Sequence, residues 1–166
     1  MKIFLIGMPG SGKTTLGRQL AKEMLMTFVD LDKEIEKREG KSVQQVFGEN
    51  GEDYFRQAES KELIEWAASS KSFVMATGGG TPCFYENIKV INQSGISIFL
   101  DVPLATLLSR LEKKTDRPLL NAGTVEEKKE RLSSLLAHRT QYYEQANIVV
   151  KNANLSKVME AIRLRK

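Results

Sequence analysis

Short apolar runs alternate with stretches of helical periodicity along most of this chain. The run 2–6 is apolar after Lys2, which is typical of a strand buried on both faces. We predict strands at residues 2–7, 28–31, 72–76, 96–101 and 146–150. We predict helices near residues 13–25, 33–39, 51–69, 83–93, 103–112, 125–143 and 154–164. The alternation predicts an α/β fold, a three-layer sandwich with a five-stranded parallel sheet between two layers of helices.

The length and the absence of repeats predict one domain. A chain of 166 residues can bury a good core, and we expect a single domain over 1–166. In open parallel sheets, ligands bind beyond the carboxyl ends of the strands. We therefore expect functional residues just after each predicted strand.

Composition narrows the class of protein. The chain is 41% hydrophobic and 28% charged, as in ordinary globular proteins, with a formal net charge of +4. Because Lys and Arg are spread along the chain, this modest excess suits an enzyme with anionic ligands better than a nucleic-acid-binding protein. We expect no nucleic-acid partner.

The chain has one cysteine and one histidine, which excludes an intrachain disulfide and a zinc site built from these residue types. Cys83 cannot form an intrachain disulfide, and with His138 it cannot build a zinc site. No stretch approaches a membrane span, and the N-terminal apolar run leads into a glycine-rich loop. We expect a cytoplasmic protein with no membrane partner.

The segment GMPGSGKT at 7–14 carries the strongest chemical signal. It fits the spacing G-x-x-x-x-G-K-[ST] between a predicted strand and a predicted helix. Backbone N–H groups of such a loop surround phosphate oxygens, and the helix N-terminus adds partial positive charge. Lys13 can reach the β- and γ-phosphates, and the Thr14 hydroxyl can ligate Mg²⁺ directly. The residues that we expect to bind ATP here are Gly10, Ser11, Gly12, Lys13, Thr14 and Thr15.

Two carboxylates follow the second predicted strand. In an extended segment, Asp30 and Asp32 point the same way and can both face the site. Such an acid could hold Mg²⁺ through water or accept a proton from a substrate hydroxyl. The run 73–76 ends without an Asp, which favours Asp30 for the metal. The alternative is that Asp32 caps the following helix.

Three glycines, Gly78, Gly79 and Gly80, follow the third predicted strand. Successive glycines are entropically costly unless the backbone must approach a ligand closely or adopt positive φ. We interpret them as part of a pocket for a small polar substrate, with a flexible loop as the alternative.

Two arginines fall on inward faces of predicted helices. Arg139 shares a stripe with Leu132, and Arg56 shares one with Leu63. Inward guanidiniums require an anionic partner. Either they bind a substrate carboxylate, or Arg56 forms a structural ion pair with Glu59 one turn away. The aromatic residues nearby are candidate pocket walls, although core packing is favoured for each of them: Phe47, Tyr54 and Phe55.

A polar, basic segment near 112–124 lacks periodicity. Long irregular loops in compact domains are commonly functional. Beside a phosphate site we expect a mobile lid, with Arg117 closing over the γ-phosphate.

Taken together, the motifs resemble those of the shikimate kinases over essentially the whole chain. The segments that carry the resemblance are GMPGSGKT at 7–14, DLD at 30–32, GEDYFRQAE at 51–59, TGGG at 77–80, RPLL at 117–120 and Arg139-x-x-Tyr142. The resemblance implies a P-loop kinase fold with a substrate-binding segment near 32–60. It implies transfer of the γ-phosphate of ATP to the 3-hydroxyl of shikimate, with Mg²⁺ as cofactor.

The resemblance also implies roles for individual residues. Lys13, Asp32 and Arg117 would be catalytic, with Asp32 as the candidate base. The residues that would bind shikimate are Asp32, Arg56, Gly78, Gly79, Gly80 and Arg139. Arg110 would stack on adenine, and Asn152 would lie along the adenine edge.

Alternatives remain open at this point. A related small-molecule kinase, such as a gluconate kinase or a nucleotide kinase, would share the phosphate loop. A nucleotide-binding regulator that binds nucleic acid and has lost catalysis is the alternative from another class. We expect a monomer, because the sequence has no obvious apolar seam.

Overall fold

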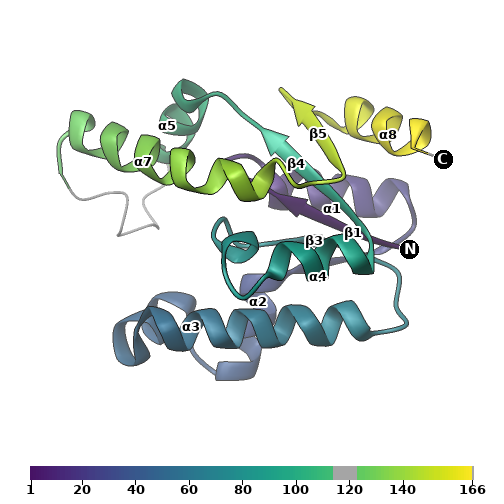
Figure 1. The fold of residues 1–166 in the computed structure, drawn as a ribbon, viewed down its shortest axis with the longest axis horizontal. Helices are drawn as coiled ribbons and strands as arrows, with labels where there is room; N and C mark the ends of the chain where they lie inside the picture. The colour runs from purple at the N-terminus through teal and green to yellow at the C-terminus, as the bar shows by residue number, and fades with distance from the viewer. Residues whose placement is uncertain (114–122, 166) are drawn as a thin grey trace.

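A five-stranded parallel sheet forms the centre of the computed structural model, which describes residues 1–113 and 123–165. The strands are β1 (Lys2–Ile6), β2 (Thr27–Asp30), β3 (Phe73–Ala76), β4 (Ile96–Asp101) and β5 (Ile148–Lys151). Their order is β2-β3-β1-β4-β5, and every pairing is parallel (Figure 1). Since β1 lies between β3 and β4, the loop after β1 leaves the middle of the sheet.

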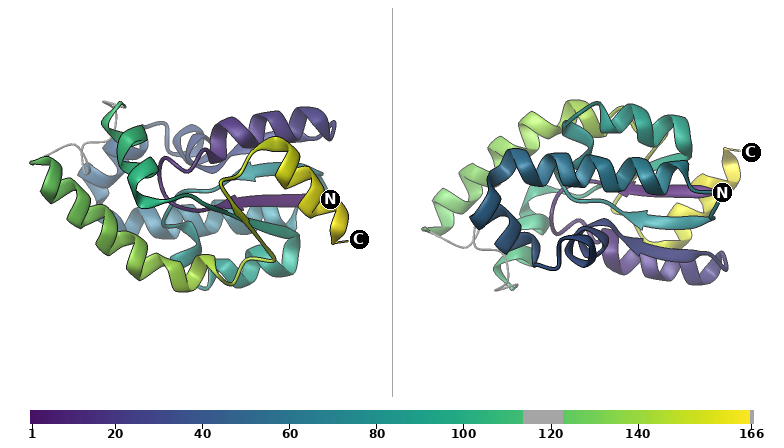
Figure 2. Two further views of the ribbon diagram at one scale, coloured as in Figure 1. Left: turned by 90° about the horizontal axis from the view of Figure 1, so that it is seen from above. Right: turned by 90° about the horizontal axis from the view of Figure 1, so that it is seen from below.

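Helices cover both faces of this sheet, as predicted. They are α1 (Lys13–Glu23), α2 (Leu31–Glu39), α3 (Val43–Ala68), α4 (Asn87–Ser94), α5 (Leu104–Glu112), α7 (Val125–Tyr143) and α8 (Leu155–Leu164), with a short 3₁₀ helix η1 (Thr81–Cys83). Figure 2 shows α1 and α8 on one side of the sheet and α3, α4 and α7 on the other. The three-layer α/β sandwich expected from the sequence is confirmed.

The alternation of side chains along β1 explains why both faces need cover. Ile3 and Leu5 enter the core under α1 and α8, whereas Phe4 and Ile6 enter the core under α3, α4 and α7. All four side chains are fully buried. Burial on both faces is the reason that the strand reads as a continuous apolar run.

The helix predicted near 51–69 begins earlier than expected, at Val43. Ser42 caps it, because the Ser42 hydroxyl accepts a hydrogen bond from the N–H of Gln45 and the Gln45 side chain accepts one from the N–H of Ser42. Gly51 then breaks the helical geometry at φ 85° and ψ 173°. The prediction missed residues 43–50 because Gly48 and Gly51 interrupt the periodicity.

The second helix, α2, also begins earlier than predicted. It starts at Leu31, directly after β2, so Asp32 lies in its first turn rather than in an extended segment. The argument that Asp30 and Asp32 share a strand face is therefore wrong. Asp32 is not the helix cap either, because Asp30 occupies that position.

An ion-pair cluster fastens α2 to α3. Arg38 of α2 pairs with Glu62, at 2.6 Å between Nε and Oε2, and donates to Glu65 at 2.9 Å. Glu62 is buried, so its charge needs this partner. The cluster therefore helps to hold α2, which carries Asp32, against α3, which carries Arg56.

Among the described helices, none is both long enough and apolar enough to cross a membrane.

Candidate active site

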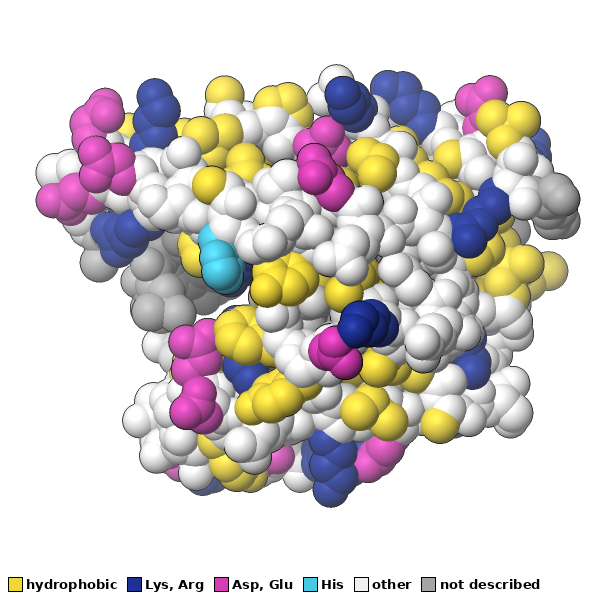
Figure 3. Space-filling model, in the orientation of Figure 1, with side chains coloured by type: hydrophobic (Ala, Val, Ile, Leu, Met, Phe, Trp, Pro, Cys, Tyr) yellow, Lys and Arg dark blue, Asp and Glu magenta, His cyan; other side chains and the backbone are white. Residues whose placement is uncertain are grey.

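A large cavity lies at the carboxyl ends of the strands, where the topology places ligands. Its volume is about 2190 Å³, and its walls come from the loop after β1, from α2 and α3, from the turn after β3, and from α5 and α7. On the face shown in Figure 3 the surface is hollowed between α7 and α3, beside the single histidine side chain. This is the edge at which the sequence predicted functional residues.

The loop at 7–14 turns tightly between β1 and α1 and surrounds the end of the Lys13 side chain. Gly12 caps α1 in a left-handed conformation, at φ 93° and ψ 11°, which a residue with a side chain rarely adopts. The Lys13 ammonium is buried inside the loop and donates to the carbonyls of Gly7 and Met8 at 2.8 and 2.9 Å. The predicted ATP-binding residues Gly10, Ser11, Gly12, Lys13, Thr14 and Thr15 all line the cavity.

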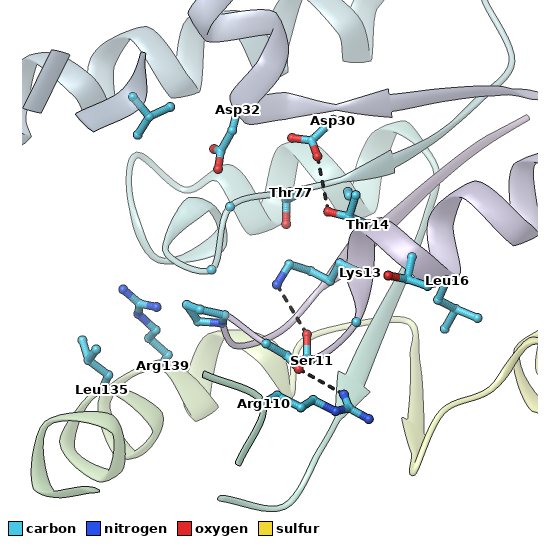
Figure 4. A pocket seen from close by; sticks show the side chains of 18 of the residues that line it. Ser11, Lys13, Thr14, Leu16, Asp30, Asp32, Thr77, Arg110, Leu135 and Arg139 are labelled. Atoms are coloured by element: carbon cyan, nitrogen blue, oxygen red, sulfur yellow. Dashed lines mark hydrogen bonds between the residues drawn. The ribbon is translucent and has the colours of Figure 1, made fainter. Parts of the chain in front are cut away.

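Thr14 and Asp30 lie together beside this loop. The Thr14 hydroxyl donates to Oδ2 of Asp30 at 3.3 Å, and both residues line the cavity (Figure 4). Hydroxyl and carboxylate oxygens are the hard ligands that Mg²⁺ prefers, and Mg²⁺ is usually held by one or two protein groups together with phosphates and water. Within the described residues no group of three His, Cys, Asp or Glu side chains could hold a metal. The pair therefore fits a magnesium ion shared with a nucleotide.

Asp32 and Arg139 face the same cavity from different helices. Figure 4 shows Asp32 of α2 and Arg139 of α7 projecting toward the pocket from its two sides. Nη1 of Arg139 is buried, yet no hydrogen-bond partner for it lies in the part of the chain that the structure describes. A buried guanidinium nitrogen without a partner is costly, so this atom is suited to an anion from outside the protein.

Arg56 is held differently. Its side chain is only 8% exposed, and its Nη1 pairs at 2.8 Å with Oε2 of Glu59, which has no exposed surface. Oε1 of Glu59 accepts a hydrogen bond from the Thr81 hydroxyl at 2.6 Å. The guanidinium also lies 4.4 Å from the ring centre of Phe84. The ion pair that the sequence left open is present, and Arg56 is not among the described residues of the cavity wall.

The turn formed by Gly78, Gly79 and Gly80, called the glycine turn below, lies against both of these arginines. A Cβ on Gly79 would lie 3.0 Å from Nη1 of Arg139, and one on Gly80 would lie 2.5 Å from Nη2 of Arg56. Gly78 and Gly79 line the cavity, whereas Gly80 stands with Arg56 behind it. The Cβ on Gly79 would also lie 2.7 Å from Cδ of Pro9, so a side chain would clash with Pro9 at Gly79 and with the Arg56 guanidinium at Gly80. A flexible loop, the alternative, does not explain those contacts.

Of the two residues predicted to contact adenine, Arg110 lies on the cavity wall and Asn152 does not. Arg110 of α5 lines the cavity, and its Nη1 donates to the Gly10 carbonyl at 3.0 Å. Asn152 lies outside the described cavity wall, which the following residues Ala153, Asn154 and Leu155 reach. Arg117 and residues 114–122 of the expected lid lie outside the described residues.

The corner between α2 and α3 supplies wall residues that sequence reasoning missed. Lys33, Glu36 and Val43 line the cavity there. Glu36 accepts hydrogen bonds from Nζ of Lys33 at 2.6 Å and from the N–H of Val43 at 3.1 Å. Burial raises the pKa of the Glu36 carboxyl, but these two hydrogen bonds and the charge of Lys33 together outweigh burial and bring the pKa below its usual value. The capping box at Ser42 was the signal that could have located this corner.

The three aromatic residues considered as pocket walls lie in different surroundings. Phe47 lines the cavity, Phe55 is buried in the core, and Tyr54 is exposed. Cys83, behind the glycine turn, is half-buried, and burial raises the pKa of its thiol to about 11 despite Arg139 and Arg56 nearby.

Comparison with known proteins identifies relatives over nearly the whole chain. The sequence model of the family described as "Shikimate kinase" matches residues 9–164. A shikimate kinase of Phocaeicola vulgatus is 46% identical over 151 residues, which cover 90% of this chain and 86% of that protein.

Solved structures agree with the sequence comparison. The crystal structure of shikimate kinase from Bacteroides thetaiotaomicron matches with a TM-score of 0.89 and 34% identity, over 99% of this chain and 96% of that one. Shikimate kinase from Acinetobacter baumannii, solved in complex with shikimate, matches with a TM-score of 0.86 and 33% identity, over 99% of this chain and 90% of that one.

Proposed function

This chain belongs to the shikimate kinase family, and we infer that it transfers the γ-phosphate of ATP to the 3-hydroxyl of shikimate. The family, the enzyme class and the reaction rest on the matches to shikimate kinases over most of the chain. The roles of individual residues, the metal and the state of assembly are our proposals. The first two rest mainly on the residues that line the cavity at the end of the sheet.

We propose that Arg139 and Arg56 bind the shikimate carboxylate. Nη1 of Arg139 is buried without a described partner, and this observation carries the proposal. Arg56 stands behind the adjacent glycine and adds positive charge, although Glu59 already shares its guanidinium. A planar guanidinium recognises a carboxylate through two parallel hydrogen bonds, so it fixes the acceptor in orientation as well as in place.

At the other end of the acceptor, we propose Asp32 as the base. Its position on the cavity wall opposite Arg139 suits a carboxylate that accepts the proton of the attacking hydroxyl. Phosphoryl transfer demands mainly positioning and charge neutralisation. Clamping the carboxylate at one end therefore helps to place the hydroxyl at the other.

On the nucleotide side, Lys13 would neutralise charge on the β- and γ-phosphates, and Arg117 would do so from the predicted lid. Thr14 and Asp30 would hold Mg²⁺, Thr14 directly and Asp30 through water. When bound, the metal ion supplies positive charge between the phosphate oxygens. The loop residues and Arg110 would contact the rest of ATP, and Asn152 stays a prediction for the adenine edge.

An assay of ADP release with alternative acceptors tests the function. We expect release with shikimate and none above background with gluconate or nucleoside monophosphates. Release driven by gluconate would instead indicate the related small-molecule kinase. Omitting Mg²⁺ should abolish turnover, and turnover that survives a chelator would contradict the metal proposal.

A monomeric enzyme in the cytoplasm that binds no nucleic acid or membrane stays a prediction from the sequence.

A further inference from the structure

Tyr143, the last residue of α7, carries a hydroxyl that the proposed mechanism does not use. It is the bulkiest fully buried side chain in the described chain, and its ring packs 5.0 Å from that of Phe99. Its hydroxyl donates to the Gly79 carbonyl at 2.5 Å and also lies 3.6 Å from Sδ of Met8. Burial raises the pKa of the Tyr143 phenol, which keeps it protonated and able to donate.

The bond to Gly79 comes from an element distant in the sequence. The carbonyls of the flanking glycines are held locally, Gly78 by the N–H of Thr81 and Gly80 by the N–H of Cys83. For Gly79 the hydrogen bond comes instead from α7, so the hydroxyl of Tyr143 joins the glycine turn to that helix.

This bond also sets the direction of the next N–H group. The described residues contain no cis peptide bond, and the C=O and N–H groups of a trans peptide point in opposite directions. A donor that holds the Gly79 carbonyl toward Tyr143 therefore turns the N–H of Gly80 away from Tyr143. The same donor fixes the spacing between the turn and Arg139, one helical turn before Tyr143, whose Nη1 is 3.0 Å from the Cβ position of Gly79.

We propose that Tyr143 is a positioning residue for shikimate, whose hydroxyl holds the glycine turn in register with the Arg139 guanidinium. This inference rests on the proposed function of the site. Tyr143 touches neither substrate; it acts through the Gly79–Gly80 peptide and the spacing to Arg139. Its loss should weaken shikimate binding and leave ATP binding intact.

Steady-state kinetics of Tyr143→Phe test this proposal, because the change removes only the hydroxyl and keeps the ring against Phe99. We expect the KM for shikimate to rise about five- to tenfold, the size of effect of one buried hydrogen bond. The KM for ATP should stay within about twofold of the wild-type value, as the bond is to the shikimate side of the cavity. Tyr85→Phe is the control, since it removes a hydroxyl from an exposed tyrosine that is not part of the described cavity wall, and both KM values should be unchanged.

Replacement of Tyr143 by 4-aminophenylalanine restores a donor at the same place and should return the shikimate KM toward the wild-type value. An unchanged shikimate KM in Tyr143→Phe overturns the proposal. An equal rise in both KM values also overturns it, as does a variant that does not fold. Each of these results would mean that the hydroxyl stabilises the fold as a whole rather than the shikimate site. A wild-type enzyme that does not phosphorylate shikimate contradicts the proposed function instead, and is recognised before any variant is compared.

Discussion

Arg56 and Arg139 have the same side chain but different surroundings. Arg56 neutralises Glu59, a carboxylate with no exposed surface, whereas Nη1 of Arg139 has no partner in the described chain. Removing Arg56 leaves the charge of Glu59 uncompensated, whereas Arg139 forms no ion pair within the described residues, so removing it leaves no buried carboxylate unpaired. Substitution of Arg139 should therefore affect shikimate binding alone, whereas substitution of Arg56 should affect both binding and the stability of the fold.

We expect Arg56→Ala and Arg139→Ala each to weaken shikimate binding by roughly 2–4 kcal/mol, as for a lost charge-assisted pair. Only Arg56→Ala should also lower the free energy of unfolding, by about 3–5 kcal/mol, because it leaves Glu59 buried and unpaired. Shikimate titration calorimetry and urea denaturation measure the two effects. Equal destabilisation by both substitutions would contradict the distinction.

Asp32 should matter for turnover more than for binding. Asp32→Asn keeps the size of the side chain but removes the proposed base, so we expect kcat to fall about 100-fold or more with shikimate still bound. Glu34→Gln is the control, since it neutralises another carboxylate in the first turn of α2 that is not part of the described cavity wall. A kcat close to wild type in Asp32→Asn would remove Asp32 from the chemistry.

Cys83 should resist alkylation because burial favours its neutral thiol. The pKa rises from 9.0 to about 11, so at pH 8 the thiolate fraction falls about 100-fold relative to an unperturbed thiol. We expect iodoacetamide to modify Cys83 at least about tenfold more slowly in the folded protein than in concentrated urea. The folded-state rate, followed by mass spectrometry, should keep rising with pH beyond pH 9, and a plateau near pH 9 would contradict the raised pKa.

At the scale of elements, α3 consists of two helices that meet at Gly51. The first, residues 43–50, contributes Phe47 to the cavity wall, and the second carries Arg56 and Glu59. A φ of 85° with a ψ of 173° is a combination almost restricted to glycine. The change in direction at Gly51 is thus encoded by one residue.

Gly51→Ala should lower the free energy of unfolding by about 1–3 kcal/mol through backbone strain, because open space surrounds the Cβ position and no clash adds to it. Gly48→Ala is the matched control. Gly48 lies within the helical turns with equally open space, so alanine there should raise stability by about 0.5–1 kcal/mol. Urea denaturation of both variants measures the difference, and two changes of the same sign would contradict it.

The sequence predicted elements best where local pattern and tertiary burial agree. The apolar run that became β1 and the loop at 7–14 needed no knowledge of the rest of the fold. Residues 43–50 were missed because two glycines conceal the periodicity, although Ser42 and Gln45 formed a recognisable cap. Asp32 was expected on the correct wall for the wrong reason, since it lies on a helix and not on a strand.

Contacts between distant segments could not be predicted in the same way. The spacing of Arg56 and Glu59 along a helix indicated their ion pair, but nothing in the sequence indicated that Thr81 donates to the same carboxylate. The bond from Tyr143 to the Gly79 carbonyl was equally hidden. Such contacts depend on how α7 and the glycine turn meet across the whole molecule.

The segments that form the candidate site all lie at one edge of the sheet, the carboxyl ends of its strands. The phosphate loop follows β1, Asp32 follows β2 and the glycine turn follows β3, while α7 returns over the same edge with Arg139. Because all strands of the sheet are parallel, their carboxyl ends lie side by side, and the segments that follow them begin close together. The scaffold therefore brings distant motifs together through topology.

The central place of β1 also has a consequence for biosynthesis. Lys2 pairs with Phe73, and Ile3 pairs with Ile96, so β1 leaves the ribosome well before either of its neighbours. Until those segments emerge, a nascent chain carries the apolar β1 with neither edge paired, a state open to aggregation and to chaperone binding. Pairing of β1 is therefore delayed until β3 and β4 have been translated.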